Sequence, residues 1–582
     1  MLKRVQHDEL EMIEKLKKKW PFFLIFLLSW WAIKPLFQVG FFPMHDDEQI
    51  ARLYELHQAL STGQFPPRWI ANLGFGYGYP FYNFYPPFVY YFGEVFHLLG
   101  FSLISATKIV MILGFILSGF FMYLLAKEFF GKIGGIVAAI FYIYAPYHAL
   151  DLYVRGALAE FYSFVFLPAI FWSTFKLVKE KSKKWLIINT VFLCFLLLSH
   201  NLITIIFLPF YFIYAIYLIC LKKQKKQIFL MILTSFLLFL GLSCYFWLPA
   251  FFERKYTLVN EILTRELASY KLHFVYLRQL WQSTWGYGGS LFGLEDGISF
   301  EVGKPHLILS FLAGFLSLFL FWKKKKKNSF SILCFLFFVF SLFMISFHSQ
   351  FIWDRLKLLW YLQFPWRFLV FAAFFSSFLS GALTGAVYER IKGRFLLRLI
   401  IASFIIFLPI FLHQNYFQPA RYLDVVDQDY TNEEDLKWRV SKMSFEFVPK
   451  GVTTTFSDIA TTQLDIEKEE IAKTPYEIIN GEIKVIKIKD VPHQKFLKTK
   501  GKGSLRINVF NFPGWKAFID KKETVIKESE KLKLITLRIP SGEHKIEVVF
   551  TDTPIRKLAN FISLVSLITI LIGGLNVKKI FA

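Results

Sequence analysis

The first long apolar stretch of the chain follows a run of lysines and reads Lys17-Lys-Lys-Trp20-Pro-Phe-Phe-Leu-Ile-Phe-Leu-Leu-Ser-Trp30-Trp-Ala-Ile33. A helix needs about 20 apolar residues to cross a bilayer, so this stretch predicts a transmembrane helix over residues 20–42. No small-residue cleavage site follows it, which indicates that the helix is retained. Because lysines gather on the cytoplasmic side, residues 1–19 are predicted to be a cytoplasmic N-terminal segment.

The composition of the whole chain also indicates a membrane protein. Of its 582 residues 55% are hydrophobic and 20% are aromatic, with 72 Phe, and its mean hydropathy is +0.44. These values exclude an ordinary soluble globular protein. The net charge of +24 comes from Lys and Arg in short clusters between apolar segments. Such clusters are a topology signal, so we expect no nucleic-acid partner. The four cysteines lie in or beside apolar segments and indicate no disulfide framework.

Further apolar segments predict about twelve transmembrane helices in total. After the first, they lie near residues 105–125, 133–147, 161–178, 186–199, 202–220, 228–249, 306–322, 329–347, 367–387, 395–412 and 557–577. This register places all the later basic clusters on the side of the N-terminus; they are residues 179–184, 222–226, 323–327, 390–394 and 578–579. Counting the short apolar segment 86–99 as a span would move them all outside, so we predict an interfacial helix there.

The same register predicts the domain organisation. Residues 20–412 form the transmembrane domain, residues 557–582 form the last helix and a cytoplasmic tail, and the extracytoplasmic segments are 43–104, 148–160, 250–305, 348–366 and 413–556. In the last of these, Leu505-Arg-Ile-Asn-Val-Phe510 and Ile535-Thr-Leu-Arg-Ile539 alternate as strands do, with turn signals at Pro513-Gly514 and Ser541-Gly542. We therefore predict a polytopic α-helical membrane protein with an extracytoplasmic β-rich domain before the last helix.

Two polar stretches stand at predicted membrane boundaries. The first, His45-Asp46-Asp47-Glu48, follows the first span directly. It could supply a carboxylate base, with a second acid that orients it or holds a metal ion, or it could be a solvated loop start or a helix cap. The second, Asp151-Leu-Tyr-Val-Arg155-Gly-Ala-Leu-Ala-Glu160, carries two acids and an arginine. Asp151 and Arg155 could also simply pair along one helix.

Cations and aromatic residues provide the other candidates. Arg367, in Gln363-Phe-Pro-Trp-Arg367, precedes a span and could grip a phosphate with two hydrogen bonds or anchor a lipid headgroup. His200 and Asn201 occupy another outer boundary, and Arg278 belongs to the long outer segment 250–305. Tyr85 lies in a Tyr- and Pro-rich stretch that is either an interfacial belt or a platform for a sugar or prenyl chain. No His and Cys spacing is typical of a zinc site.

Several of these motifs together resemble a known family. His45-Asp46-Asp47, the stretch Asp151 to Glu160, Ser199-His200-Asn201 and Gln363-Phe-Pro-Trp-Arg-Phe368 look like the bacterial membrane family described as 6-pyruvoyl-tetrahydropterin-synthase-related. The layout of the first two spans, with Tyr85-Pro-Pro between them, resembles the GT-C superfamily of membrane glycosyltransferases. The outer stretch Phe510-Asn-Phe-Pro-Gly-Trp515-Lys-Ala-Phe-Ile-Asp520 is similar to the C-terminal domain of YfhO-like membrane proteins.

The resemblance implies a transferase in the bacterial plasma membrane. Its donor would be a polyprenyl-phosphate-linked sugar, and its acceptor an extracytoplasmic glycan, polymer or glycolipid. Asp46 or Asp47 matches the position of the base, and the predicted substrate-binding residues are His45, Tyr85, Asp151, Arg155, Glu160, His200, Asn201, Arg278, Gln363 and Arg367. Of these, Arg155, His200, Arg278 and Arg367 would stabilise the departing phosphate.

No cofactor is expected, although paired acids could hold a divalent cation. Two other functions stay open: a transporter or flippase for lipid-linked glycans, and a non-catalytic protein of cell-envelope assembly. The flippase is less favoured because few charges lie at midspan and no repeated halves are evident.

Overall fold

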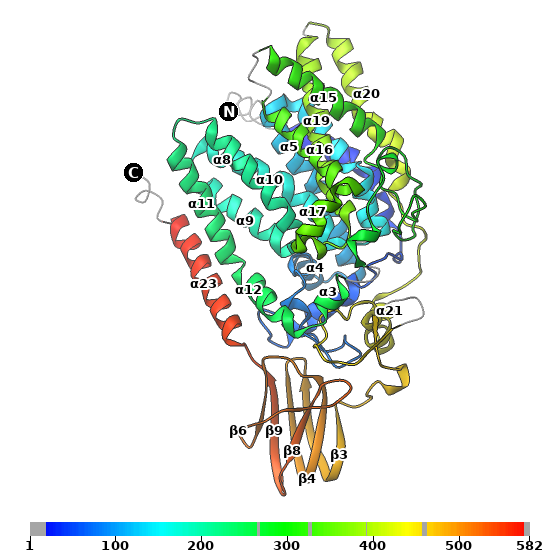
Figure 1. The fold of residues 1–582 in the computed structure, drawn as a ribbon, viewed down its shortest axis with the longest axis vertical. Helices are drawn as coiled ribbons and strands as arrows, with labels where there is room; N and C mark the ends of the chain where they lie inside the picture. Colours follow the sequence, from blue (N-terminus) through cyan, green and yellow to red (C-terminus); the bar gives the residue numbers. More distant parts are fainter. Residues whose placement is uncertain (1–18, 265–267, 324–328, 392, 457–461, 576–582) are drawn as a thin grey trace, which may run out of the picture.

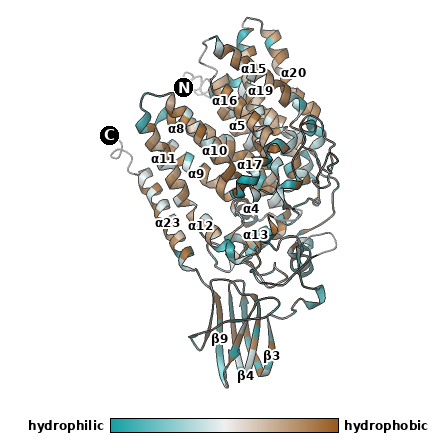
Figure 2. Cartoon of the chain, in the orientation of Figure 1, coloured by the Kyte–Doolittle hydropathy of each residue, from teal (hydrophilic) through white to brown (hydrophobic). Residues whose placement is uncertain are grey.

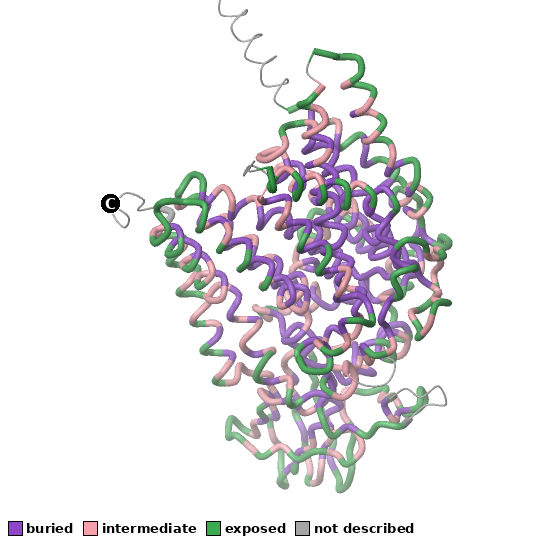
Figure 3. The backbone as a smooth tube through the Cα atoms, turned by 45° about the horizontal axis from the view of Figure 1, so that its top comes forward, coloured by how far each residue is buried: buried purple, intermediate pink, exposed green. Residues whose placement is uncertain are grey.

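A bundle of helices forms most of the molecule, and a β-sheet extends from one end of it (Figure 1). The computed structural model describes residues 19–264, 268–323, 329–391, 393–456 and 462–575. The predicted N-terminal segment up to residue 18 and the basic pair 578–579 lie outside these residues. Figure 2 shows hydrophobic residues along the helices, and Figure 3 shows buried residues inside the bundle with exposed ones on its outer surface.

Eight of the described helices are long and apolar enough to span a membrane. They are α5 (Leu103–Ile143), α7 with α8 (Leu158–Glu180), α10 (Asn201–Cys220), α11 (Lys225–Leu242), α15 (Lys304–Trp322), η9 with α19 (Pro365–Arg390), α20 with η10 (Phe395–Tyr416) and α23 (Pro554–Leu575). A ninth results if Lys19–Leu28 and Trp30–Phe37, which meet at 44°, form one bent span. The predicted membrane class is confirmed, whereas this measure does not confirm the count of about twelve.

Two reasons explain the difference in number. The apolar helices α9 (Lys183–Ser199) and α16 (Ser329–Ile345) have 17 residues each, one fewer than the 18 required for a span. In addition, α5 contains two helices joined at Gly131, where φ is 72° and ψ is −176°. A Cβ added to Gly119 would lie 2.5 Å from Cδ1 of Ile143, a proximity that a straight helix cannot produce. The two parts of α5 therefore run antiparallel, as the separate predicted spans 105–125 and 133–147 require.

The reversal at Gly131 gives the first testable prediction. Its φ and ψ lie in a region that is open essentially only to glycine, and a Cβ there would meet nothing within 4 Å. We expect Gly131→Ala to lower the free energy of unfolding by about 1–3 kcal/mol through backbone strain alone, measured by thermal unfolding in detergent. Gly573→Ala is the control, because that helical glycine has equally open surroundings and alanine favours a helix. Equal destabilisation of both variants would contradict the prediction.

The first predicted outer segment folds into two helices against the sheet-side end of the bundle. They are α3 (Gln49–Ser61) and α4 (Phe88–Leu98). Helix α4 has only 11 residues, too few to cross a bilayer, in agreement with the short helix predicted at 86–99. It packs against α5, and the ring of Phe88 lies 4.7 Å from that of Phe195 at the end of α9.

The sheet is antiparallel and includes the predicted strands. Its strands are β3 (Tyr476–Val491), β4 (Gln494–Phe510), β5 (Trp515–Ile519), β6 (Lys522–Thr524), β7 (Lys527–Glu528), β8 (Leu534–Ile539) and β9 (Glu543–Phe550). Strand β4 is central, because it pairs with β3 along its length, with β9 over 494–500 and with β8 over 503–510. Alternate residues of β4 and β8, such as Leu505 and Leu537, are buried. The predicted β-rich domain before the last helix is confirmed.

The segment between α20 and the strands packs against the helical bundle. Leu423 pairs with Phe41 through two backbone hydrogen bonds. The carboxylate of Asp427 in α21 (Asp427–Thr431) accepts hydrogen bonds of 2.7 and 3.0 Å from the amides of Leu103 and Ile104. An acid in this place satisfies donors that the start of α5 cannot pair internally.

A buried ion pair joins α23 to the rest of the bundle close to the sheet. Arg556 in α23 is fully buried, and its Nε and Nη2 each lie 2.9 Å from Oε2 of Glu253, the last residue of α12 (Cys244–Glu253). Asn83 of the first outer segment donates a hydrogen bond of 2.8 Å to the same oxygen. Arg556 Nη2 also donates to the carbonyl oxygen of Pro513 in the sheet domain. These contacts fix the sheet at this end of the bundle.

Candidate functional site

Backbone hydrogen bonds bring the two polar boundary stretches together. The amide of His45 donates to the carbonyl of Val154 over 3.0 Å, and that of Asp46 donates to the carbonyl of Arg155 over 2.8 Å. The side chain of Gln49 donates to the carbonyl of Gly156 over 2.9 Å. The acidic stretch after the first span therefore lies directly on the stretch that contains Asp151, Arg155 and Glu160.

Glu160 is the centre of a buried charged group, which we call the Glu160 cluster and define as Tyr147, Asp151, Arg155, Glu160 and Arg367. The side chain of Glu160 is 1% exposed, and its Oε2 lies 3.0 Å from Nη1 of Arg155 and 3.1 Å from Nε of Arg367. The hydroxyl of Tyr147 donates a hydrogen bond of 2.6 Å to Oε1. Two guanidinium groups thus share one carboxylate away from water, an arrangement that is stable only while the charges stay paired.

Asp151 adds a second acid to the cluster. It lies in η3 (Leu150–Val154), a turn of π-helix, and its Oδ1 accepts a hydrogen bond from Nη1 of Arg155, so the helical pairing considered from the sequence is present. Burial and then the neighbouring Glu160 raise the pKa of Asp151 well above its usual value. The guanidinium of Arg155 lies over the ring of Trp366, 4.6 Å from its centre, which holds its plane in place.

His200 and Asn201 lie beside the cluster and cap a helix. Nε2 of His200 is 4.0 Å from Oε2 of Glu160, while its Nδ1 accepts a hydrogen bond from the amide of Ile203 at the start of α10. Oδ1 of Asn201 accepts a hydrogen bond of 2.9 Å from the amide of Leu202. His200 is therefore next to the charged group, whereas the described contact of Asn201 is local.

The turn before α19 (Leu369–Arg390) positions Arg367. Gln363 adopts a φ of 62°, and η9 (Pro365–Phe368) follows at once. Nη1 of Arg367 donates a hydrogen bond of 2.8 Å to the carbonyl of Leu362. The turn thus directs Nε of Arg367 towards Glu160, and Gln363 acts here through its backbone.

The acids after the first span differ in their partners. Oδ2 of Asp47 lies 3.3 Å from Nη1 of Arg439, and burial, partly offset by Arg439, raises the pKa of Asp47 to about 6. Oε2 of Glu48 lies 3.7 Å from Nη2 of Arg52, and burial raises the pKa of Glu48 to about 7. Both acids are therefore committed to arginines of the surrounding fold.

Asp46 is different, because no hydrogen bond or ion pair engages its carboxylate within the described part of the chain. Its side chain is only partly buried. Burial alone would lower the pKa of Arg155. The neighbouring groups outweigh this effect and raise the pKa of Arg155, and Asp46 is one of them, together with Glu160, Tyr147 and Asp151. The carboxylate of Asp46 is thus within electrostatic reach of the Glu160 cluster and has no partner of its own among the described residues.

Comparison with known sequences identifies the family. The sequence profile described as "6-pyruvoyl-tetrahydropterin synthase related domain; membrane protein" matches residues 82–417, more than half of the chain. The chain belongs to this family. The match includes the whole Glu160 cluster, and it confirms the resemblance seen in the sequence motifs. The described residues contain no group of three or more His, Cys, Asp or Glu side chains that could hold a metal ion.

Individual relatives are distant. An uncharacterized protein of Lactococcus lactis subsp. cremoris is 26% identical over 333 residues, a match that covers 54% of this chain and 52% of that protein. The chain therefore matches about half the length of this relative. Among solved structures, the apo oligosaccharyltransferase of Archaeoglobus fulgidus has a TM-score of 0.45 at 14% identity, covering 70% of this chain and 57% of that one. The oligosaccharyltransferase AglB from Archaeoglobus fulgidus, in complex with an inhibitory peptide and a dolichol-phosphate, has a TM-score of 0.46 at 14% identity with the same coverage.

The remaining predicted site residues of this family member lie elsewhere. Tyr85 is close to the acidic stretch, where the guanidinium of Arg52 lies 4.5 Å from its ring centre. His45 is exposed, with Nε2 3.2 Å from the carbonyl oxygen of Tyr287. Arg278 is exposed in α14 (Leu277–Trp281). Within the described residues no contact of its side chain reaches the Glu160 cluster, so the structure does not bring Arg278 together with the other candidate cations.

Sequence reasoning missed two arginines near the site. Arg52 is four residues after Glu48, and this spacing on one helix is a signal that could have identified it. Arg439 has no such local signal, because almost the whole predicted transmembrane domain separates it from Asp47 in the sequence. Only the packing of the segment before the strands reveals that Asp47 is paired.

A buried acid in the same outer segment gives a pH-dependent prediction. Glu55 in α3 accepts hydrogen bonds from the side chain of Asn72 and the amides of Ala71 and Asn72, and burial raises its pKa from 4.5 to about 7. A raised carboxyl pKa means that the folded state binds the proton more tightly than the unfolded state. The resulting stability is complete below pH 4.5 and is lost as the pH rises to about 7.

We expect Glu55→Gln to remove this pH dependence, because the amide does not ionise. Its one oxygen replaces only one of the two acceptor oxygens that Glu55 uses, so the change of stability with pH is compared and not the absolute stability. Between pH 4.5 and 7 the wild type should lose up to about 3 kcal/mol relative to the variant, measured by thermal unfolding in detergent. Glu128→Gln, which removes an acid that pairs with Lys179 at 2.8 Å, serves as the control for the pH series. Parallel curves for wild type and Glu55→Gln would contradict the prediction.

Proposed function

We propose that the protein is a GT-C-type glycosyltransferase, which moves a sugar from a polyprenyl-phosphate carrier to an acceptor hydroxyl on the outer side of the membrane. The observation that carries the proposal is the carboxylate of Asp46, which has no hydrogen bond or ion pair among the described residues and acts electrostatically on Arg155 of the Glu160 cluster. A base and a phosphate-binding group side by side are what this reaction needs. Membership of a membrane-protein family is consistent with a lipid-linked donor.

In the proposed reaction Asp46 accepts the proton of the acceptor hydroxyl while the acceptor oxygen attacks the anomeric carbon of the donor sugar. The bond from this carbon to the phosphate oxygen breaks, and the lipid phosphate leaves with the electron pair. All the described contacts of Arg155 with Asp151, Glu160 and Tyr147 use Nη1, which leaves Nε and Nη2 as donors for the departing phosphate. A guanidinium can offer two parallel hydrogen bonds to such an anion.

The position of the cluster in the bundle supports a donor in the outer leaflet. Glu160 lies near the start of α8 (Ser163–Glu180), and Arg367 precedes α19. The lysine-rich turn 222–226 lies at the other end of α10, away from the sheet in Figure 1. Lysine-rich turns favour the cytoplasm, so the cluster and the sheet would face the opposite compartment. A donor tethered by its lipid tail is held at that surface, whereas a nucleotide sugar is not.

Reconstitution of the full chain in vesicles tests the proposal. We expect radiolabelled sugar to be transferred from polyprenyl-phosphate-linked donors to extracted cell-surface glycans or glycolipids, and free polyprenyl phosphate to inhibit the transfer. Nucleotide-linked forms of the same sugars are the control donors and should be inactive. Transfer from nucleotide sugars without a lipid carrier, or movement of intact lipid-linked glycan across the bilayer without sugar transfer, would overturn it.

A further inference from the structure

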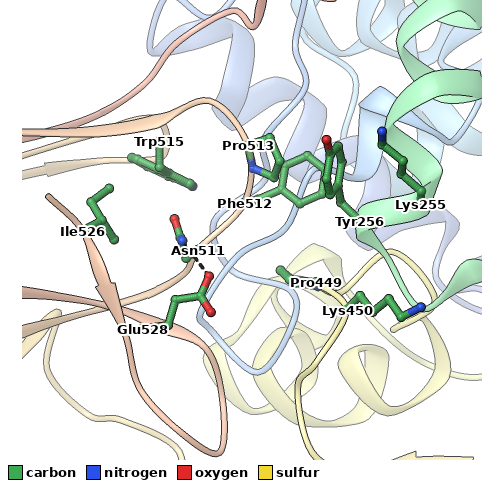
Figure 4. Close-up of a pocket in the computed structure, with 10 residues that line it drawn as sticks. All are labelled: Lys255, Tyr256, Pro449, Lys450, Asn511, Phe512, Pro513, Trp515, Ile526 and Glu528. Atoms are coloured by element: carbon green, nitrogen blue, oxygen red, sulfur yellow. Dashed lines mark hydrogen bonds between the residues drawn. The ribbon is translucent and has the colours of Figure 1, made fainter.

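A cavity of about 470 Å³ lies between the sheet and the helical bundle, separate from the Glu160 cluster. Figure 4 shows that Tyr256, Lys255 and Lys450 line its bundle side, and that Asn511, Trp515 and Glu528 are among the residues of its sheet side. Its volume is within the range of about 300–1,000 Å³ that is typical of small-molecule sites. The sheet-side wall comes from the Asn511-Phe-Pro-Gly-Trp515 motif, which the proposed transfer reaction does not use.

The indole of Trp515 forms a buried wall with a free donor. Its side chain packs against Trp69 and Phe550, with ring centres 5.0 and 5.4 Å away, and the residue is 6% exposed. Nε1 of Trp515 is buried and has no hydrogen-bond partner among the described residues. In Figure 4 the nitrogen end of the indole faces Asn511 and Phe512. A buried donor without a partner is unfavourable, and an oxygen of a bound molecule in the cavity would satisfy it.

Polar and aromatic groups in the cavity add the features of a saccharide site. Nδ2 of Asn511 donates a hydrogen bond of 2.9 Å to Oε1 of Glu528, which leaves the amide oxygen and Oε2 as acceptors for hydroxyl groups. Tyr256 is 41% exposed, so its ring offers a face to the C–H surface of a sugar. Lys255 and Lys450 are exposed on the bundle side, where Nζ of Lys255 lies 5.0 Å from the ring centre of Tyr256 and Nζ of Lys450 lies 3.7 Å from Oε1 of Glu261. Both exposed ammonium groups attract anionic substituents.

We propose that this cavity binds an oligosaccharide that carries acidic groups. The free indole donor and the Asn511–Glu528 pair hold sugar hydroxyls, the ring of Tyr256 stacks on a sugar face, and the two lysines select for negative charge. Binding here is independent of the proposed transfer chemistry, because no residue of the Glu160 cluster lines the cavity. The cavity is thus a holding site for a glycan beside the membrane.

The experiment uses the full chain in detergent on an array of acidic oligosaccharides, such as oligogalacturonates and phosphate-substituted glycans, with neutral oligosaccharides of matched length. We expect acidic members to be retained by the wild type, and their affinity to fall about tenfold or more in Tyr256→Ala and in Lys255→Ala with Lys450→Ala. Tyr276→Ala is the matched control, because Tyr276 is also 41% exposed but lies outside the cavity. Thermal unfolding confirms that each variant is folded.

Three results would overturn the inference: no retained saccharide, equal retention of neutral and acidic members, or equal affinity in the cavity variants and Tyr276→Ala. Asp46→Asn should bind the acidic oligosaccharides as the wild type does. Failure of sugar transfer and failure of saccharide binding are therefore distinguished in the same set of proteins.

Discussion

Replacement of Asp46 by asparagine should reduce the rate of sugar transfer by about 10²–10⁴-fold, the usual contribution of a general base. Asparagine has nearly the same shape but cannot accept the proton of the acceptor hydroxyl. Within the described residues the carboxylate of Asp46 has no ion-pair partner, so the substitution leaves no buried cation unpaired. The expected result is a loss of kcat with unchanged thermal unfolding, measured on vesicles with a polyprenyl-phosphate-linked donor.

Asp47 and Asp424 provide the comparison. Asp47 is paired with Arg439, so Asp47→Asn should lower the stability and reduce transfer less than Asp46→Asn does. Asp424 is an exposed acid on the segment that pairs with Phe41, and Asp424→Asn should retain wild-type transfer. Full activity in Asp46→Asn would remove this residue from the role of base, and a larger loss in Asp47→Asn would assign the role to Asp47.

The second large effect is expected at Glu160. In Glu160→Gln the neutral amide replaces the carboxylate that Arg155 and Arg367 share at 3.0 and 3.1 Å. Removing one member of a buried ionic group leaves the other charges without compensation, which costs about 3–5 kcal/mol of unfolding free energy. We also expect transfer to be lost, because both guanidinium groups shift when their common anchor is gone. Thermal unfolding in detergent measures the first effect and the vesicle assay the second.

Glu180 lies at the other end of the span Leu158–Glu180 and is the matched control for Glu160. Its side chain is 41% exposed and pairs with Lys176 at the surface. Exposed ion pairs contribute about 0–1 kcal/mol, so Glu180→Gln should unfold close to the wild type and retain transfer. If Glu160→Gln were as stable as Glu180→Gln, the Glu160 cluster would not be an obligatory buried ion group.

Much of the architecture could be predicted from local patterns. Apolar length and lysine clusters predicted the membrane class, the short helix at 86–99 and the reversal between 105–125 and 133–147, because each depends on residues close together in the sequence. Strand alternation in 505–510 and 535–539 predicted two strands of the sheet for the same reason. The count of about twelve spans is not confirmed by helix length, since α9 and α16 have 17 residues each and packing sets where such helices end.

The sequence by itself determined which residues are chemically equipped for the site: the acids after the first span, the Asp151 to Glu160 stretch and Arg367. Only the tertiary structure decided how they are used. In the folded chain Glu160 pairs with both Arg155 and Arg367. Arg278 does not join them. Arg439 pairs with Asp47 and not with Asp46. The physical reason is range: hydropathy and strand alternation act between near neighbours, whereas ion pairing in a buried site depends on which distant segments pack against each other.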